Sequence, residues 1–586
     1  MCYGYPEGSG ESMKTIVTPI AAAMLGLPAV ASAQADAGHA FFEQNCAVCH
    51  SVERGVPAGQ GPGLFGVAGR KIGSAPGFGY SDALKAAGAG GERWTDTALD
   101  AFLAAPDKAR PGTTMPVNVP AARDRAAVIA YLKTLKAPKN ANGPRKLSDF
   151  PDMTPEAVTA ATARAHDQGF DVWSEDKPGT AHRIDLKSLP KPLATANVGN
   201  PAKLAPRPAG ALPQVPDGFT VSVFSDALVH PRNIVVAPDG DVFVAETAKG
   251  RVTVLRPNGA AAGPPAVYAT GLNGPFGMAF YPSGPHPRYL YVADALRVVR
   301  YAYHDGDLAA GPAEVVVPKL AETVGGHATR TLVFTAGDAH MLVSVGAATN
   351  AANDLPPAPP VPLAQWEKLH GAGAAWGGEV ERAAVLQFDP DGGHRQPYAQ
   401  GLRNCVGMAI EPKTGVLLCT NNERDYLGDD LPPDFFTRVP KGSFFGWPWR
   451  YIGDHEDPRH AGERPDLAGR VRLPDTLIQP HSAPLGVALY HAPAGAAHAF
   501  GPAYEGDAFI ALHSSGNRTL RTGSKLIRVH MKDGVPSDGY EDFMTGLVVD
   551  NNAVWGKPVG VAVAADGALL VSDDVADVIW RIAPKP

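Results

Sequence analysis

One short sequence theme occurs six times between residues 233 and 574, and this repetition limits the folds open to the chain. In each copy an apolar strand is followed by a turn built around Pro, Asp or Gly, a second apolar strand and a polar or acidic tip. Copies that start about 42 to 80 residues apart suit four-stranded blades with loops of unequal length. We therefore predict an all-β six-bladed propeller over residues 216–586. The six copies are residues 233–246, 275–294, 329–345, 406–421, 485–513 and 559–574.

A ring of this kind also predicts where chemistry would take place. Loops from one rim converge on the central axis, so we expect the functional side chains on a single rim. Residues 219–224 read as a further strand. We expect this strand to close the ring by joining the last blade.

Composition and charge exclude one class of partner. The chain of 586 residues has 65 Gly and 56 Pro, which favours many turns over long helices. Its formal net charge is -7 and its acidic and basic residues are scattered along the chain. Nucleic-acid binding needs a concentrated basic surface, so we expect no nucleic-acid partner.

The N-terminal segment indicates export. Met13 and Lys14 precede a run from residue 16 to 30 with one polar residue, Thr18, and the pattern Ala31-Ser32-Ala33 follows. This order is typical of a secretory signal peptide, and we assign residues 1–33 to a leader, with Met13 as an alternative start. An amphipathic helix retained in the fold is the alternative. No other segment approaches about 20 apolar residues, so we predict a periplasmic protein without a membrane span.

The sequence Cys46-Ala47-Val48-Cys49-His50 predicts covalent haem. Two thiols in this spacing add to the haem vinyl groups, and the adjacent His50 places a ring nitrogen on the iron. A redox dithiol of thioredoxin type is the alternative, but it requires a preceding strand. Residues 37–45 read as a short helix instead, which favours haem c.

The residues after this motif resemble a known family. Met115 lies in the stiff loop 111–116, and a helix is predicted over 121–135. With the runs 61–71 and 77–81 and with Trp94, residues 36–137 resemble a class I cytochrome c, a small all-α domain. The resemblance implies that Pro62 supports His50 and that Met115 is the sixth iron ligand. It also places Arg70, Tyr80 and Trp94 near the haem propionates.

Residues 138–215 are rich in Pro, Ala, Lys and Asn, as in 187–192 and 206–209. Such composition favours extended backbone over a packed core. One helix is predicted near 155–168. We interpret this stretch as a connector that runs over the propeller, without a catalytic role.

Three polar segments interrupt the apolar propeller sequence. They are residues 325–330, which include His327 and Arg330, residues 401–404, which end in Arg403 and Asn404, and the acidic stretch 421–430, followed by Gly446-Trp447-Pro448. Each one alone has an ordinary structural interpretation. Together with residues 481–486, 517–518 and 557–560, they resemble the quinoprotein glucose and sorbosone dehydrogenase family, and the sorbosone dehydrogenase branch most.

This resemblance implies a set of cofactors and roles. His327 would take the proton of a substrate hydroxyl, and Asn404 would hydrogen-bond quinone or substrate oxygens. The carboxylates of PQQ would pair with basic side chains, and a calcium ion would lie among oxygen ligands of the acidic stretch. The basic residues are Arg403 and Arg518, with Arg330, Lys557 or Arg232; the calcium ligands are Glu423, Asp425 and Asp429.

The expected activity is a two-electron oxidation of an aldose or sugar aldehyde. One haem takes one electron at a time, so the fused haem c would drain PQQ stepwise and pass electrons to a downstream cytochrome or quinone-linked chain. Gly516 and Ala328 stand where the family has bulkier residues, so the substrate stays open.

Two other functions fit parts of this pattern. A nitrite reductase of the haem d1 type also joins a cytochrome to a propeller, but it needs eight blades and the sequence has six copies. A propeller without cofactor, which transfers electrons or binds a ligand, is the second alternative.

The pairing of Cys405 and Cys419 is a separate question. A hairpin turning at 412–415 sets Cys419 opposite Met408 and leaves Cys405 about 10 Å away at about 3.3 Å per residue. We expect no disulfide from this register, although an oxidising compartment would permit one.

Overall fold

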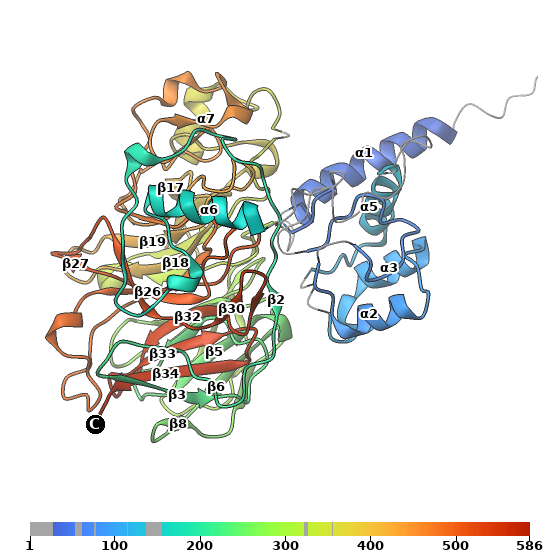
Figure 1. Ribbon diagram of the computed structural model, residues 1–586. Helices are drawn as coiled ribbons and strands as arrows, with labels where there is room; N and C mark the ends of the chain where they lie inside the picture. The colour runs from blue at the N-terminus through green and yellow to red at the C-terminus, as the bar shows by residue number, and fades with distance from the viewer. Residues whose placement is uncertain are drawn as a thin grey trace, which may run out of the picture.

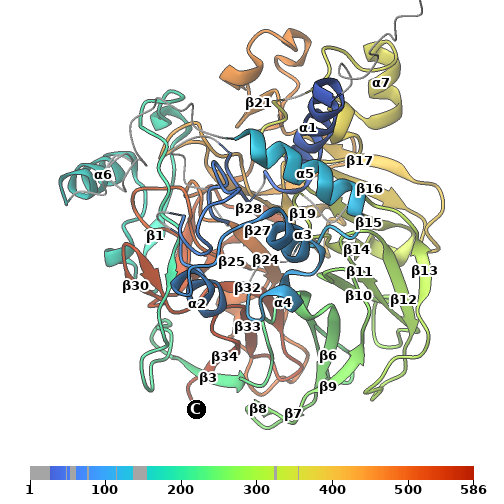
Figure 2. The same cartoon turned by 90° about the vertical axis from the view of Figure 1, so that its right-hand side faces the viewer.

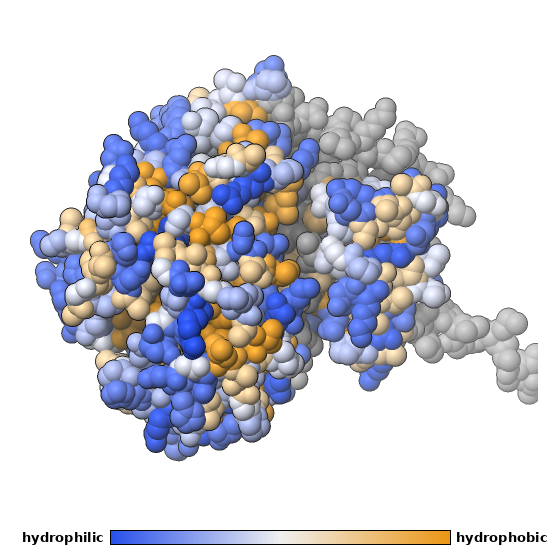
Figure 3. Space-filling view, turned by 90° about the horizontal axis from the view of Figure 1, so that it is seen from below, coloured by the Kyte–Doolittle hydropathy of each residue, from blue (hydrophilic) through white to orange (hydrophobic). Residues whose placement is uncertain are grey.

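The structure is a computed structural model that describes residues 27–47, 49–52, 61–75, 78–113, 115, 117–135, 155–321, 326–353 and 355–586. Figure 1 shows a small helical domain beside a larger strand-rich domain, and Figure 3 shows both from below with mixed polar and apolar surfaces. Each domain has its own buried core. Among the described residues, no helix is long and apolar enough to cross a membrane.

The helical domain is built around two helices in contact, α1 and α5. Gly38 of α1 permits this contact, because a Cβ there would lie 2.0 Å from the carbonyl oxygen of Ala127. The helices predicted at 37–45 and 121–135 are thereby confirmed. Of the predicted leader, residues 1–26 lie outside the described residues and residues 27–33 begin α1. The helices are α1 (Leu27–Asn45), α2 (Asp82–Ala89), α3 (Asp96–Ala104), α4 (Pro106–Ala109) and α5 (Ala122–Thr134).

Six sheets of at least four strands make up the strand-rich domain, one for each sequence copy. The first is β4 (Ile234–Val236), β5 (Val242–Glu246), β6 (Arg251–Leu255) and β9 (Ala266–Ala269). The second is β10 (Gly277–Tyr281), β11 (Tyr289–Ala293), β12 (Val298–Ala302) and β13 (Glu314–Val317). The third is β14 (Leu332–Phe334), β15 (Met341–Val345), β16 (Ala384–Phe388) and β17 (Gln396–Gln400).

The other three sheets follow the same antiparallel order. The fourth is β18 (Cys405–Ile410), β19 (Leu417–Asn421), β20 (Asp434–Val439) and β23 (Thr476–Ile478). The fifth is β24 (Pro484–Leu489), β25 (Ala508–Leu512), β26 (Lys525–Val529) and β29 (Tyr540–Met544). The sixth is β32 (Pro558–Val563), β33 (Leu569–Asp573), β34 (Val578–Pro584) and β3 (Phe219–Ser225). As predicted, β3 pairs with the last strand of the chain.

The six sheets form a closed ring. The innermost strands contact one another in the order β4, β10, β14, β18, β24, β32 and back to β4. They line one axial cavity of about 320 Å³, apolar except for Asn233, Ser283 and Thr331. Figure 2 views the ring with the helical domain in front of it. The fold is therefore the predicted six-bladed propeller behind a small all-α domain.

Repeated glycines explain how closely the innermost strands approach. A Cβ at Gly407 would lie 2.2 Å from the carbonyl oxygen of Leu485, and one at Gly486 would lie 2.5 Å from that of Val559. Gly560 stands in the same relation to Arg232, at 2.4 Å. The glycine in the Gly-x-Ala segments of the repeat thus marks where one blade contacts the next.

Short elements complete the chain, and Figures 1 and 2 label several of them. In the connector they are α6 (Pro155–Gln168), β1 (Ala181–His182) and β2 (Lys203–Leu204). The rest are β7 (Pro257–Asn258), β8 (Ala261–Ala262), α7 (Leu363–His370), β21 (Arg450–Tyr451), β22 (His455–Glu456), β27 (Met531–Lys532), β28 (Val535–Pro536), β30 (Val548–Asp550) and β31 (Ala553–Val554).

The connector is extended, as predicted, but it is firmly attached to the propeller. Its α6 confirms the helix predicted at 155–168, β1 pairs with β29, and β2 pairs with β31. Beside β1, the buried Nζ of Lys525 lies 2.8 Å from Asp171 and Asp542 and 3.0 Å from Asp176. This ionic cluster joins two connector carboxylates to the fifth sheet.

Candidate functional site

The haem motif directly follows α1. Burial raises the pKa of Cys46 to about 12 and that of Cys49 to about 11, so both are thiols at neutral pH. The Nδ1 atom of His50 hydrogen-bonds the carbonyl oxygen of Pro62 at 2.7 Å, which leaves Nε2 for a metal. Gly61 is required here, because a Cβ would lie 2.3 Å from the His50 ring. The contact between His50 and Pro62 follows the expected relation.

The other predicted haem residues belong to one core. Met115 packs against the cluster that contains Cys46, Tyr80 and Trp94. Arg70 donates hydrogen bonds to the carbonyl oxygens of Gly63 and Phe65, and its backbone pairs with Trp94. Met115 is partly buried against this core, and a thioether and a His ring are the donor types that would hold the iron of haem c.

The predicted site residues of the propeller lie on one rim of the ring. Innermost strands begin at this rim and second strands end there, as the pairing of Cys405 with Asn421 shows. His327 precedes β14, Arg403 and Asn404 precede β18, and Asp425 follows β19. The lining of the axial cavity includes Thr331 and Val406, which follow His327 and Asn404 in the chain, so the cavity lies just inside this rim.

His327 and Asn404 lie side by side at the rim. A Cβ added to Gly346 would lie 2.6 Å from both the Oδ1 of Asn404 and the Cβ of His327. The Nδ1 of His327 bonds the carbonyl oxygen of Ala347 at 2.8 Å, so Nε2 is the nitrogen left to accept a proton. Burial lowers the pKa of His327 well below its ordinary value, and the charge of Arg403 lowers it further. The ring is therefore neutral at pH 7.

Gly326, directly before His327, lies against the protein's own backbone. Gly326 has a φ of 71°, and a Cβ there would lie 2.7 Å from the carbonyl oxygen of Ala348. Gly325 lies outside the described residues. The close approach at Gly326 is to the protein's own backbone, which the sequence could not distinguish from approach to a ligand.

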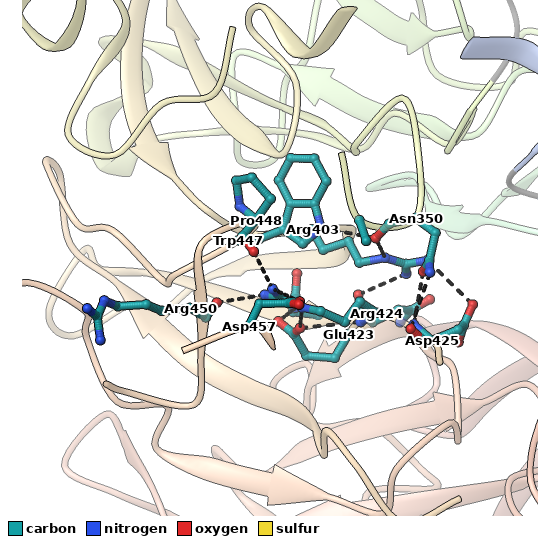
Figure 4. Close-up of polar contacts among 12 residues, drawn as sticks. Asn350, Arg403, Glu423, Arg424, Asp425, Trp447, Pro448, Arg450 and Asp457 are labelled. Atoms are coloured by element: carbon teal, nitrogen blue, oxygen red, sulfur yellow. Dashed lines mark hydrogen bonds and ion pairs between the residues drawn. The ribbon is translucent and has the colours of Figure 1, made fainter. Parts of the chain in front are cut away.

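Arg403 is held beside the acidic stretch. Its Nε and Nη2 donate to the backbone and side-chain oxygens of Asn350 at 3.0 and 2.8 Å, and Nη2 lies 3.7 Å from Asp425 (Figure 4). Burial would raise the pKa of Asp425, but a hydrogen bond from His481 and the charge of Arg403 lower it to about 2. Asp425 is therefore an ionised partner that fixes the guanidinium.

Several buried basic groups at this rim have nitrogen atoms without a hydrogen bond inside the described part of the chain. These atoms are Nε and Nη2 of Arg330, Nε and Nη1 of Arg518 and Nε of Arg232. The buried Oδ1 of Asn404 is in the same situation. Buried polar atoms normally have partners, so this set fits an absent polar ligand that carries anionic groups.

The acidic stretch is organised around an arginine that sequence reasoning missed. Arg424 is fully buried and lies 3.0 Å from both Glu423 and Asp457. It also donates to the carbonyl oxygens of Pro448 and Arg450, as Figure 4 shows. These bonds tie the stretch to the Gly446-Trp447-Pro448 turn. Arg424 lies within the acidic stretch 421–430, but nothing in the sequence around it distinguishes it from a surface arginine.

The structure does not bring Glu423, Asp425 and Asp429 together as a calcium cage. Glu423 pairs with Arg424, Asp425 with Arg403, and Asp429 lies 3.2 Å from Arg164 of the connector. Within the described ranges, the one group of three acidic or His side chains with ligand atoms within 4.8 Å of one another is Asp171, His182 and Asp542. There the ammonium of Lys525 already lies between the carboxylates.

A disulfide joins Cys405 to Cys419, contrary to our expectation. Met408 does face Cys419, as the register predicted, but an irregularity in the strand between Cys405 and Met408 adds one residue. Cys405 is therefore opposite Asn421, and its Cα lies 5.8 Å from that of Cys419. The expected separation was wrong because sequence does not reveal a β-bulge.

A second His and carboxylate pair lies on the same rim. His513 Nε2 is 2.9 Å from Asp574, which also binds Arg232 at 2.8 Å. Lys557 is near this pair, and burial lowers its pKa while Asp574 opposes the shift. His513 and Asp574 come from different sheets. The acidic tip of the sixth repeat was the available sequence indication of Asp574.

Comparisons with known proteins agree with this division of the chain. Residues 35–136 match the Cytochrome c family, and residues 213–432 match the TrAA12-like family. Cytochrome c of Euglena viridis is 44% identical over 103 residues, which cover 97% of that protein and 17% of this chain.

Solved structures match the strand-rich domain at the level of fold. The holo form of the pyranose dehydrogenase PQQ domain from Coprinopsis cinerea has a TM-score of 0.50 and 21% identity, over 65% of this chain and 99% of that one. The iodide structure of a Trichoderma reesei enzyme of carbohydrate-active family AA12 has a TM-score of 0.50 and 19% identity, over 64% and 98%.

Proposed function

Because residues 35–136 belong to the cytochrome c family and the strand-rich domain shares the fold of a solved PQQ domain, we propose that this chain is a PQQ-dependent dehydrogenase that passes electrons to its own haem c. The proposed substrate is an aldose or a sugar aldehyde such as sorbosone. The single observation that carries the proposal is a neutral His327 beside Arg403 and Asn404, on a rim with several unsatisfied buried guanidinium groups.

The residues present fit the proposed cofactor. When bound, PQQ would supply the acceptor for the hydride that leaves the substrate carbon. Arg518, Arg330 and Lys557 would hold its carboxylates, since guanidinium groups pair with carboxylates in a bidentate way. Arg403 already has Asp425 as its carboxylate, so its charge is oriented before any ligand binds.

His327 provides the base of the reaction. Its Nδ1 is engaged by Ala347, so the substrate hydroxyl would give its proton to Nε2. Asn404 lies beside it with donor and acceptor atoms for the substrate oxygens. Calcium has no step in this proposal, because the predicted ligands are each engaged by an arginine.

The haem domain would remove electrons one at a time. His50 and Met115 would hold the iron, and haem with two protein ligands transfers electrons without binding substrate. The haem domain comes close to the propeller at Gln44 of α1, whose side-chain nitrogen lies 3.4 Å from the position that a Cβ would take at Gly378, next to Glu379. We place the protein in the periplasm on the evidence of the leader sequence, with a cytochrome or quinone-linked chain as the external acceptor.

The test is haem reduction by substrate. The purified protein is incubated with PQQ and then mixed with members of a panel of aldoses and ketoaldehydes while the haem absorbance is recorded. We expect the haem to be reduced only when PQQ and a suitable sugar are both present. A haem reducible by chemical reductant, in a protein that neither binds PQQ nor responds to any sugar, would instead support a propeller without cofactor.

A further inference from the structure

Two buried arginines of the propeller rim lie in the loop that follows β25. Within this loop, residues 513–524, His513 contacts Asp574 beyond the sixth sheet and Asn517 donates to Asp425 beyond the fourth sheet. It therefore crosses the rim between blades and carries Arg518 and Arg521. Both side chains are at most 1% exposed.

Arg521 is a cation whose hydrogen-bond partners are all neutral. Its side chain donates to the carbonyl oxygens of Ser515 and Asn551 and, at 2.8 Å, to the Oδ1 of Asn200. Its Nε has no hydrogen bond among the residues that the structure describes. Burial lowers the pKa of Arg521 to about 10, so it stays charged at pH 7. A buried cation without a bonded carboxylate is suited to an anionic ligand.

Asn200 belongs to the connector, not to the propeller. It is 5% exposed, its backbone N–H donates to Gly516, and its Nδ2 donates to the carbonyl oxygens of Thr519 and Asn551. One connector side chain thus holds both the loop and the guanidinium of Arg521. The backbone N–H of Asn200 contacts the loop at Gly516, where the family resemblance led us to expect a bulky residue.

Arg518 is held by the connector in a similar way. Its guanidinium carbon lies 5.6 Å from the ring centroid of Phe170, and its Nη2 lies 2.8 Å from Asp430. Arg164 of α6 lies 3.4 Å from the other oxygen of Asp430 and 3.2 Å from Asp429. Phe170 of the connector therefore packs against the guanidinium of Arg518, and Arg164 of the connector pairs with the carboxylates next to it.

We propose that the connector is part of the cofactor site, and that Asn200, Phe170 and Arg164 are positioning residues that aim Arg521 and Arg518 at the carboxylates of PQQ. This inference rests on the proposed function and extends it, because it gives the segment between the domains a role in cofactor binding. It also adds Arg521 to the residues that would hold PQQ.

The first test measures the affinity of the full-length protein for PQQ, by equilibrium dialysis. Asn200→Ala removes the acceptor for Arg521 and the side-chain bonds to the carbonyl oxygens of Thr519 in the loop and Asn551 outside it. We expect PQQ to bind about tenfold more weakly, the range for one hydrogen bond to a charged group. At saturating PQQ, the kcat with sugar should stay within about twofold, because His327 is not touched.

A matched control uses another arginine contact of the connector. Arg183 lies 2.7 Å from Asp538, its side chain is 73% exposed, and among the described residues it has no hydrogen bond to the loop 513–524. Arg183→Ala should leave the affinity for PQQ unchanged. If Asn200→Ala fails to fold, Arg164→Gln is the second variant, since Arg164 is 35% exposed, and roughly threefold weaker binding is expected.

A double-variant cycle separates positioning from general weakening. If Asn200 acts through Arg521, Asn200→Ala should weaken PQQ binding little in a protein that already carries Arg521→Gln. Hydrogen exchange of the amides of residues 513–522 should become faster in Asn200→Ala and stay unchanged in Arg183→Ala.

The possible outcomes separate this inference from the proposed function. A wild-type protein that does not bind PQQ overturns both. A wild-type protein that binds PQQ, with an equal affinity in Asn200→Ala or additive effects in the cycle, overturns only the role of the connector. Weaker binding with a non-additive cycle supports it.

Discussion

The haem site and the propeller site differ in how far apart their residues are along the chain. The haem residues lie between Cys46 and Met115, in the segments before, between and after α2, α3 and α4. The rim residues lie between Asn200 and Asp574 and come from the connector and several sheets. A local site can be recognised from spacing alone, whereas an assembled site depends on a ring that has to close first.

The largest expected effect is on the rate of the reaction at the propeller rim. His327→Ala should lower kcat by about 10²- to 10⁴-fold, the range for loss of a general base. The haem absorbance spectrum should not change, because the hydrophobic core of the haem domain includes no residue near His327. A variant that keeps full activity with added PQQ and sugar would show that another group acts as base, and His513 would be the next candidate.

The next effect concerns the attachment of the connector to the ring. Lys525→Met would leave three buried carboxylates without their cation, which costs about 3–5 kcal/mol of unfolding free energy. Chemical denaturation at pH 7, followed by tryptophan fluorescence, measures it. The control Lys441→Met removes an exposed lysine that bonds Gln387 and should change stability by less than about 0.5 kcal/mol. Equal stabilities of the two variants would contradict the ionic cluster.

A smaller loss of stability is expected when the disulfide between Cys405 and Cys419, beside the rim site, is removed. The double variant Cys405→Ala and Cys419→Ala opens a loop with a sequence separation of 14, for which a loss of about 2–4 kcal/mol is typical. We expect a lower midpoint for the unfolding of the strand-rich domain and an unchanged one for the helical domain. A common shift of both transitions would mean that the two domains unfold together.

The smallest expected effect is a displacement of the pH profile. Burial and the charge of Arg403 hold the pKa of His327 below 6.5, so its neutral form persists as the pH falls to that value. The acid limb of kcat/KM should then have its midpoint below pH 6.5. A midpoint at or above 6.5 would contradict the lowered pKa of His327 and would indicate that the acidic stretch outweighs burial and the charge of Arg403.

The sequence predicted the architecture well because each element left a local pattern. The six repeats, the helix at 155–168 and the pairing of β3 with β34 are all confirmed. The repeat and its glycines can be read directly from the sequence, and these glycines lie where neighbouring blades of the ring contact each other.

What could not be predicted depends on contacts between distant residues. Asp429 looked like a metal ligand until the structure placed Arg164 beside it, from 265 positions earlier in the chain. Arg424 looked like a surface residue and is fully buried. The Cys405 and Cys419 bridge depends on one extra residue in a strand. The connector looked like a passive link because its composition says nothing about what it contacts.

The pairing of β3 with β34 has a consequence for how the protein is made. The sixth sheet combines residues 219–225 with residues 578–584, so its hydrogen bonds cannot form until nearly the whole chain is available. The helical domain has all its residues some 450 positions earlier, by Leu135. We therefore expect haem attachment to be possible on a nascent or truncated chain, whereas truncation before Val578 would remove β34 and leave the edges of β33 and β3 exposed.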